Sequence, residues 1–206
     1  MFKIYCEVCR KNLKIFLLPA VFSVLLLIII LFIITNLRNI NIGRAAVICQ
    51  QFFAWSGIFL LSPVFMPEQK DNIEETVLSK AVPVKAVYLI RLAEALLTLV
   101  LFTAGFLGLL LLFGSEIEFT RYFFHTLGTA LLLGSLGFAG TRFAGNIGVG
   151  YLIAFGFYVV QMFLPVDRIA NAEYFFIFTL LIETNNILLI YICALFLIIV
   201  PFFKRH

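Results

Sequence analysis

Residues 15–35 read Ile-Phe-Leu-Leu-Pro-Ala-Val-Phe-Ser-Val-Leu-Leu-Leu-Ile-Ile-Ile-Leu-Phe-Ile-Ile-Thr, and this run decides the class of fold. No charged side chain interrupts it, and a helix of this length reaches across a hydrocarbon layer of about 30 Å. Backbone polar groups in lipid must be hydrogen-bonded within their own segment, so a run this apolar is expected to be helical. The sequence therefore predicts a membrane-spanning helix here.

The rest of the chain has a similar composition. Of its 206 residues, 63% are apolar and 13% are charged, with a mean hydropathy of +1.11, whereas soluble domains carry about 25% charged residues. Membrane β-strands would alternate polar and apolar residues, and these runs do not. We expect an all-α integral membrane protein with one transmembrane domain over residues 1–206. Six transmembrane helices are predicted, at Ile15–Thr35, Ala45–Met66, Val87–Phe113, Arg121–Ala139, Ile147–Pro165 and Ile187–Phe203.

This composition makes a soluble enzyme, a secreted disulfide scaffold and a nucleic-acid-binding domain poor fits. The net charge of +4 comes from fifteen basic residues, which in a multi-span protein mainly report which loops face the cytoplasm. Placing both termini in the cytoplasm puts eleven basic residues on that side and four outside. The inner ones are Lys3, Arg10, Lys11, Lys14, Lys70, Lys80, Lys85, Arg91, Arg142, Lys204 and Arg205, and the outer ones are Arg38, Arg44, Arg121 and Arg168. We therefore expect a multi-pass protein of the cytoplasmic (plasma) membrane.

Two further segments have an amphipathic or interfacial pattern. Residues 1–14 place Phe2, Cys6, Cys9 and Leu13 at helical spacing opposite basic residues, which predicts an interfacial helix on the inner membrane surface. The alternative is a basic leader that only sets topology. Residues 166–186 contain an apolar run too short to span, which predicts a re-entrant or interfacial segment on the outer side of the membrane, before the last span.

The linker of residues 67–86 differs from everything around it. Asp71 followed by Glu74 is an N-cap signal with an acidic residue in the first turn. Ile73 and Val77 then share one face, and Pro83 ends the helix because the residue before a proline is pushed out of the α region. The pattern predicts a short cytoplasmic helix of about ten residues, roughly 15 Å long. It either only connects two spans or offers a contact surface to a soluble partner.

The linker resembles the coupling loop of ABC type-2 exporter permeases. The run from Glu68 to Pro83 lies between a second and a third span, as that loop does, and fits the outline Asn-Ile-Glu-Glu-Leu-Leu-x-Ser-x-Pro. Thr76 and Val77 stand where a leucine pair is commoner, and the proline comes slightly late. The family's six spans, cytoplasmic termini, amphipathic N-terminal helix and hydrophobic re-entrant segment also match the layout above. The residues that the resemblance implies in coupling are Glu68, Asp71, Asn72, Ile73, Glu74, Glu75, Val77, Leu78 and Lys80.

The resemblance implies a transport subunit that is not itself an enzyme. ATP and Mg²⁺ would be bound by separate cassette ATPase subunits, two per assembly, and this chain would bind no cofactor. Its sequence has no Gly-x4-Gly-Lys-Ser/Thr phosphate loop. A second permease copy or a related permease would complete the pathway, with membrane lipid around it and no nucleic acid. An amphipathic or lipid-like molecule or a hydrophobic peptide suits the apolar runs as cargo.

Polar residues within the runs are candidates for the pathway. Gln51 and Trp55 share one face of the second run, and Tyr158 and Gln161 share one face of the fifth. The resemblance implies that these four residues line the pathway, and the alternative is that they form hydrogen bonds between helices. Arg91 is predicted to form an ion pair with Glu94, three residues further along the third run.

Other patterns indicate packing rather than chemistry. His125 fits an interfacial hydrogen-bonding residue, and the glycines between residues 134 and 150 fit close helix packing. Cys6 and Cys9 lack the second pair that a zinc site needs, so no metal site is predicted. A non-transporting scaffold or immunity-type membrane protein is an alternative function. An intramembrane enzyme is disfavoured, because the sequence shows no convergent set of ionisable residues.

Overall fold

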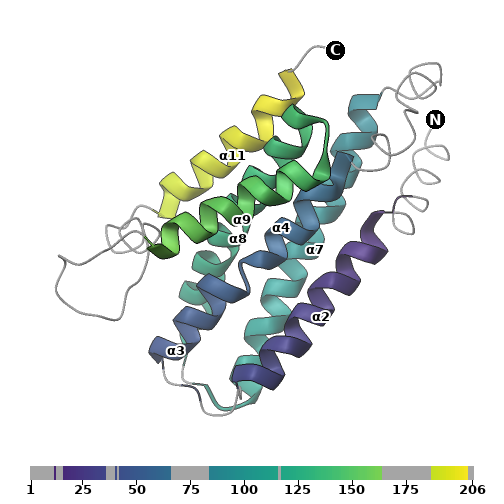
Figure 1. Ribbon diagram of the computed structural model, residues 1–206. Helices are drawn as coiled ribbons and strands as arrows, with labels where there is room; N and C mark the ends of the chain where they lie inside the picture. The colour runs from purple at the N-terminus through teal and green to yellow at the C-terminus, as the bar shows by residue number, and fades with distance from the viewer. Residues whose placement is uncertain are drawn as a thin grey trace.

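A computed structural model describes residues 12, 16–35, 40, 42–65, 84–115, 117–163 and 187–203. These residues form a bundle of helices, and no strand occurs among them (Figure 1). The predicted interfacial helix of residues 1–14 (apart from Asn12), the linker of residues 67–86 (apart from residues 84–86) and the predicted segment of residues 166–186 lie outside the described residues.

The elements in chain order are helical throughout. They are α2 (Leu18–Thr35), α3 (Ile42–Val47), the π-helix η2 (Ile48–Phe52), α4 (Trp55–Leu61), the 3₁₀ helix η3 (Ser62–Phe65), α7 (Val84–Leu112), α8 (Phe119–Ala144), α9 (Ile147–Phe163) and α11 (Ile187–Phe203).

Four segments are long and apolar enough to cross a membrane. They are Leu18–Thr35, Gly43–Phe65, Ala86–Leu112 and Phe119–Ala144. These helices are compatible with the predicted all-α membrane protein. The fifth and sixth predicted positions also hold apolar helices, but these are shorter, at Ile147–Val160 and Ile187–Phe203. Six crossings therefore remain a prediction. The fourth helix extends from Phe119 to Ala144 and is therefore longer at both ends than its predicted range of 121–139.

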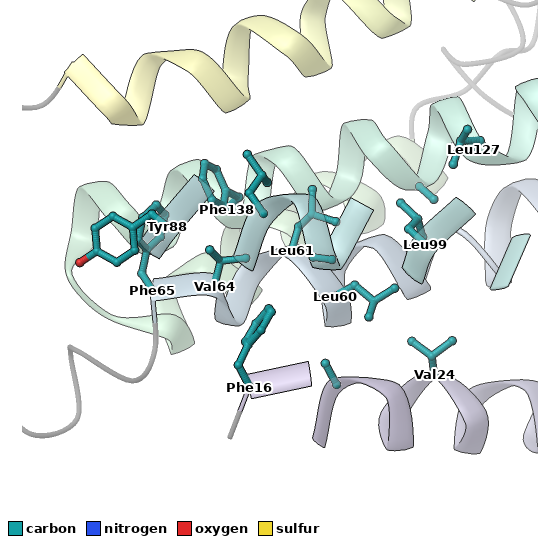
Figure 2. Packing of buried hydrophobic residues seen from close by; sticks show 14 residues of the cluster. Phe16, Val24, Leu60, Leu61, Val64, Phe65, Tyr88, Leu99, Leu127 and Phe138 are labelled. Atoms are coloured by element: carbon teal, nitrogen blue, oxygen red, sulfur yellow. The ribbon is translucent and has the colours of Figure 1, made fainter. Parts of the chain in front are cut away.

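The helices run alternately up and down the bundle (Figure 1). One end, called the loop end here, holds the start of α2, η3, the start of α7, the α8–α9 turn and the end of α11. Figure 2 shows Phe65, Tyr88 and Val64 gathered in the hydrophobic cluster at this end, with Phe16 beside them. The opposite end holds a second cluster with Leu31, Ile40, Ala45 and Leu110 among its members. Phe65 and Val84, the described residues on either side of residues 66–83, thus both lie at the loop end.

Helix α8 occupies the centre, in contact with α4, α7, α9, α11 and η3. Glycines allow this close packing: a methyl group on Gly57 would collide with the Ala130 carbonyl, and one on Gly134 would collide with the backbone of Gly57. Gly137 faces Ser62 and Gly140 lies against Gly150 in the same way. The predicted packing role of the glycines at 134, 137, 140 and 150 is confirmed.

A tight turn joins α8 to α9. Gly145 has φ +65°, a left-handed conformation that favours glycine at a helix C-terminus. The Oδ1 atom of Asn146 accepts a hydrogen bond of 2.7 Å from the Gly148 amide, which caps the start of α9. The sequence Gly145-Asn146 therefore fixes α8 and α9 as an antiparallel pair.

The second span differs from the continuous helix predicted over Ala45–Met66. It is divided into α3, the π-helix η2, a turn at Phe53 and Ala54, α4 and η3. Pro63 has no amide hydrogen to donate, which fits the change to 3₁₀ geometry at the loop end. The break near the middle of the span is visible between α3 and α4 in Figure 1.

Candidate functional sites

The first candidate site lies where the 66–83 linker joins the bundle, and Arg91 is its central charge. Arg91 belongs to α7 and is 6% exposed. Its Nε donates a hydrogen bond of 3.0 Å to Oδ1 of Asn12, and its Nη1 donates one of 3.2 Å to the Val64 carbonyl. Carbonyls at the end of a helix lack partners within that helix. Arg91 therefore ties α7 to the last turn of the second span and to Asn12.

A group of aromatic rings and a second arginine lies beside it. The Phe65 ring lies 4.8 Å from the Tyr88 ring, edge to face, and 4.6 Å from the Phe138 ring. The Arg142 guanidinium carbon lies 5.3 Å from the Phe65 ring centroid and 5.6 Å from that of Tyr88. A cation over an aromatic face is attracted by the ring quadrupole. These contacts join η3, α7 and α8.

Val64, Phe65, Tyr88, Arg91 and Arg142 together are called the loop-base cluster here. Phe65 is the last described residue before the linker, and Tyr88 lies in the first described turns after it. The cluster therefore connects the described residues on both flanks of the linker with each other and with α8.

The predicted coupling residues themselves, from Glu68 to Lys80, lie outside the described residues. Arg91 makes its two named hydrogen bonds with Asn12 and Val64, and its predicted ion pair with Glu94 stays a prediction. Sequence reasoning placed Arg91 and Arg142 on the cytoplasmic side but missed their partners. Phe65 and Tyr88 lie on the two sides of the linker, and that position could have drawn attention to them, whereas no signal in the sequence points to Asn12.

The second candidate site is an aromatic contact between α4 and α9. The Trp55 and Tyr158 rings lie 5.4 Å apart at 87°, and the Trp55 and Phe155 rings lie 5.6 Å apart at 83°. Phe59 continues the contact toward the loop end, with its ring 6.1 Å from that of Phe155 and 6.4 Å from that of Tyr151. The rings fill the space between the two helices edge to face, an arrangement that stabilises aromatic pairs.

Two of the four predicted pathway residues, Trp55 and Tyr158, are thus in contact. Tyr158 is buried, while Trp55 is half-buried. Gln51 is also half-buried and lies in η2, on the other side of the break from Trp55. Gln161 belongs to α9, and its side chain lies outside what the structure describes.

Other candidates show no convergent chemistry within the described ranges. His125 is half-buried in α8, and its carbonyl accepts a hydrogen bond of 3.2 Å from Thr129. Cys49 is buried and Cys193 is exposed, and both are free thiols. Among the residues that the structure describes, no group of three or more His, Cys, Asp or Glu side chains could hold a metal ion.

Four helices that are long and apolar enough to cross a membrane indicate the class of helical membrane proteins. No protein-family model, curated protein or solved structure matches the chain. The function is therefore argued from the loop-base cluster and the aromatic contact.

Proposed function

We propose that this chain is the transmembrane subunit of an ATP-driven exporter. The linker of residues 67–86 would bind a separate cassette ATPase on the cytoplasmic side. Six crossings with both termini inside, two permease copies or a permease pair, and two ATPase subunits would complete the assembly. An amphipathic or lipid-like molecule or a hydrophobic peptide would be the cargo.

The observation that carries the proposal is the attachment of the linker to the bundle. A connector that only reversed the chain would need no rigid base, but Arg91 joins α7 to the Val64 carbonyl and Arg142 stacks on Phe65 and Tyr88. In this proposal, a movement of the linker would be passed to the second span, α7 and α8 through these contacts. This is the property required of an element that uses the binding of a partner to favour one arrangement of packed helices over another.

The aromatic contact supports a place for the pathway. The α4 half of the second span carries Trp55 and ends in the loop-base cluster, so the two candidate sites share one rigid element. A change imposed at Phe65 would move Trp55 relative to Tyr158 on α9. We propose that this contact, with Gln51 and Gln161, borders the path of the cargo.

Purification together with a cassette ATPase, taken from the genes next to that of this chain, tests the proposal, and the absence of such a gene would itself count against it. We expect a stable complex whose ATPase activity depends on the permease. Charge reversal of Glu74 and Glu75 to lysine, or Ile73→Asp, should abolish both. The matched control reverses Glu173 and Glu183, which are predicted to lie on the opposite side of the membrane, and should leave both unchanged.

Two results would contradict the proposal. If the linker variants retain both the complex and its stimulated ATPase activity, the linker is not the coupling element. If the complex forms but vesicles containing it never move an amphipathic probe such as a fluorescent phospholipid or a hydrophobic peptide, a non-transporting scaffold is the better interpretation.

A further inference from the structure

We propose that the π-helix Ile48–Phe52 is a hinge within the second span, and that its one surplus residue moves into the turn at Phe53 and Ala54 and rotates the residues that it passes. The proposal concerns the chain by itself and does not depend on the transport function.

The hydrogen bonds at the break identify the surplus residue. The Phe53 amide donates a 2.9 Å hydrogen bond to the Ile48 carbonyl, five residues earlier. After the turn, the Ser56 amide bonds to the Phe53 carbonyl at 2.9 Å and the Gly57 amide to the Ala54 carbonyl at 3.2 Å, three residues earlier. A π-turn holds one residue more than an α-helical turn, and the i→i−3 turns that follow it hold one residue fewer. The extra residue of the π-turn is called the surplus residue here.

Two close contacts hold the chain around the break. Cys49 of η2 and Phe53, the residue after η2, are fully buried in the cluster that includes residues of α2 and α7, and the Phe53 ring stacks on Phe106 of α7 at 4.5 Å and 12°. In α4, Gly57 lies against the backbone of Ala130 in α8, and α4 also contacts α2 and α7. The turn at Phe53 and Ala54 thus lies between the contact of Phe53 with α7 and the contact of Gly57 with α8.

A second discrete arrangement is available to this segment. If the Phe52 amide replaces the Phe53 amide as donor to the Ile48 carbonyl, η2 becomes an ordinary α-turn and the surplus residue passes into the turn at Phe53 and Ala54. The residues that are passed over then rotate by about 100°, the angle of one residue in an α-helix. Phe53 leaves its stack on Phe106, and Gln51 turns relative to Trp55. Two discrete arrangements of one packed element are what a conformational switch requires.

Trp55 makes the hinge directly observable, because it is the only tryptophan in the chain. It is the first residue of α4, and its ring contacts Tyr158 and Phe155. We would grow the full-length protein with 5-fluorotryptophan, reconstitute it in lipid nanodiscs and record ¹⁹F NMR spectra. We expect two resonances, or one resonance with relaxation dispersion, because the indole has a different neighbourhood in each arrangement.

Deletion of Gln50 is the decisive variant. Without this residue, the Phe53 amide lies four positions after Ile48, so the observed bond becomes an ordinary α-helical one and no surplus remains. Phe53 keeps its place on Phe106, and we expect a single sharp resonance. The matched control Gln50→Ala removes the same side chain but keeps the chain length, and it should retain both states.

A second variant, Phe106→Leu, keeps the test decisive even if the deletion fails to fold. It removes the aromatic stack that holds Phe53 in the observed arrangement and should raise the population of the other state by roughly threefold. A single wild-type resonance without relaxation dispersion overturns the proposal. Two resonances that persist in a folded Gln50 deletion, or an unchanged ratio in Phe106→Leu, overturn it as well.

Discussion

Helices α2 and α8 both cross the bundle from end to end, yet their surroundings are opposite. Only 22% of the residues of α2 are buried, against 72% in the most apolar stretch of α8. The more apolar of the two helices is α2, and most of its large side chains face outward. Among them are Leu18, Phe22, Leu25, Leu26, Ile29, Ile30, Phe32, Ile33 and Ile34.

The difference teaches which force packs these helices. Lipid tails are as apolar as leucine, so hydrophobicity does not drive one membrane helix against another. Close packing depends instead on shape and on small residues, and α8 supplies Gly134, Gly137 and Gly140 where its neighbours come closest. Helix α2 has no glycine and presents branched side chains to its surroundings. The centre of the bundle is therefore the helix with the smaller and more polar side chains.

The largest loss of stability is expected from a variant that disrupts the close packing of α4 on α8. In Gly57→Ala the new methyl group would collide with the Ala130 carbonyl, a backbone atom that cannot move aside without displacing α8. We expect the free energy of unfolding to fall by about 3 kcal/mol, at the upper end of overpacking costs. The loss should appear in SDS-induced unfolding of the protein in mixed micelles.

Its matched controls are Gly105→Ala and Gly108→Ala in α7. Nothing lies within 4 Å of a Cβ atom built on either glycine. Alanine is also the better helix former, so these variants should be neutral or slightly more stable. Equal losses at all three positions would mean that glycine matters for helix flexibility here and not for close approach.

A smaller effect is expected at the loop-base cluster. Arg91→Met keeps an unbranched apolar side chain but removes both hydrogen bonds, leaving the Val64 carbonyl without this donor. We expect a loss of about 1.5–3 kcal/mol, the usual contribution of hydrogen bonds to a charged group. The same unfolding measurement applies, with Arg121→Met as control because Arg121 is exposed on α8. A neutral Arg91→Met would mean that the flanks of the linker are held by aromatic packing alone.

The positions of the helices could be predicted from the sequence because apolar runs long enough to span require helical hydrogen bonding. Helix α11 lies at its predicted range of 187–203, and α7 begins within a few residues of its predicted start. The break at Ile48–Phe52 could not be predicted in this way. Gln50 and Gln51 make it more polar than its neighbours, but hydropathy carries no information about whether an amide bonds four or five residues back.

The candidate sites also contain residues that could be predicted from the sequence and contacts that could not. Trp55 and Tyr158 could be nominated from helical spacing, because spacing places a residue on a face of a helix. Which faces meet depends on contacts between distant segments, such as Phe65 with Tyr88 and Arg142. Single-sequence patterns do not encode these pairings. The predicted coupling residues of the linker remain predictions because they lie outside the described ranges.

The smallest expected effect concerns α2, and it also tests whether this chain acts alone. Val24 is fully buried, whereas Ile33 is 73% exposed. Val24→Ala removes packing contacts and should cost about 1 kcal/mol, while Ile33→Ala should change the free energy of unfolding by less than about 0.5 kcal/mol, as surface substitutions usually do. Both values come from SDS-induced unfolding at two protein-to-detergent ratios.

The dependence on that ratio makes the small effect informative. If α2 faces only lipid, Ile33→Ala is neutral at both ratios, because the side chain at this position makes no contact within the protein and is surrounded by apolar lipid or detergent tails. If α2 instead packs on a second copy, the protein is stabilised by association and its stability rises with concentration. Ile33→Ala would then become costly at the higher ratio while Val24→Ala would cost the same at both. The exposed face of α2 would in that case be a surface between copies, and the contrast with α8 would hold only for the single chain.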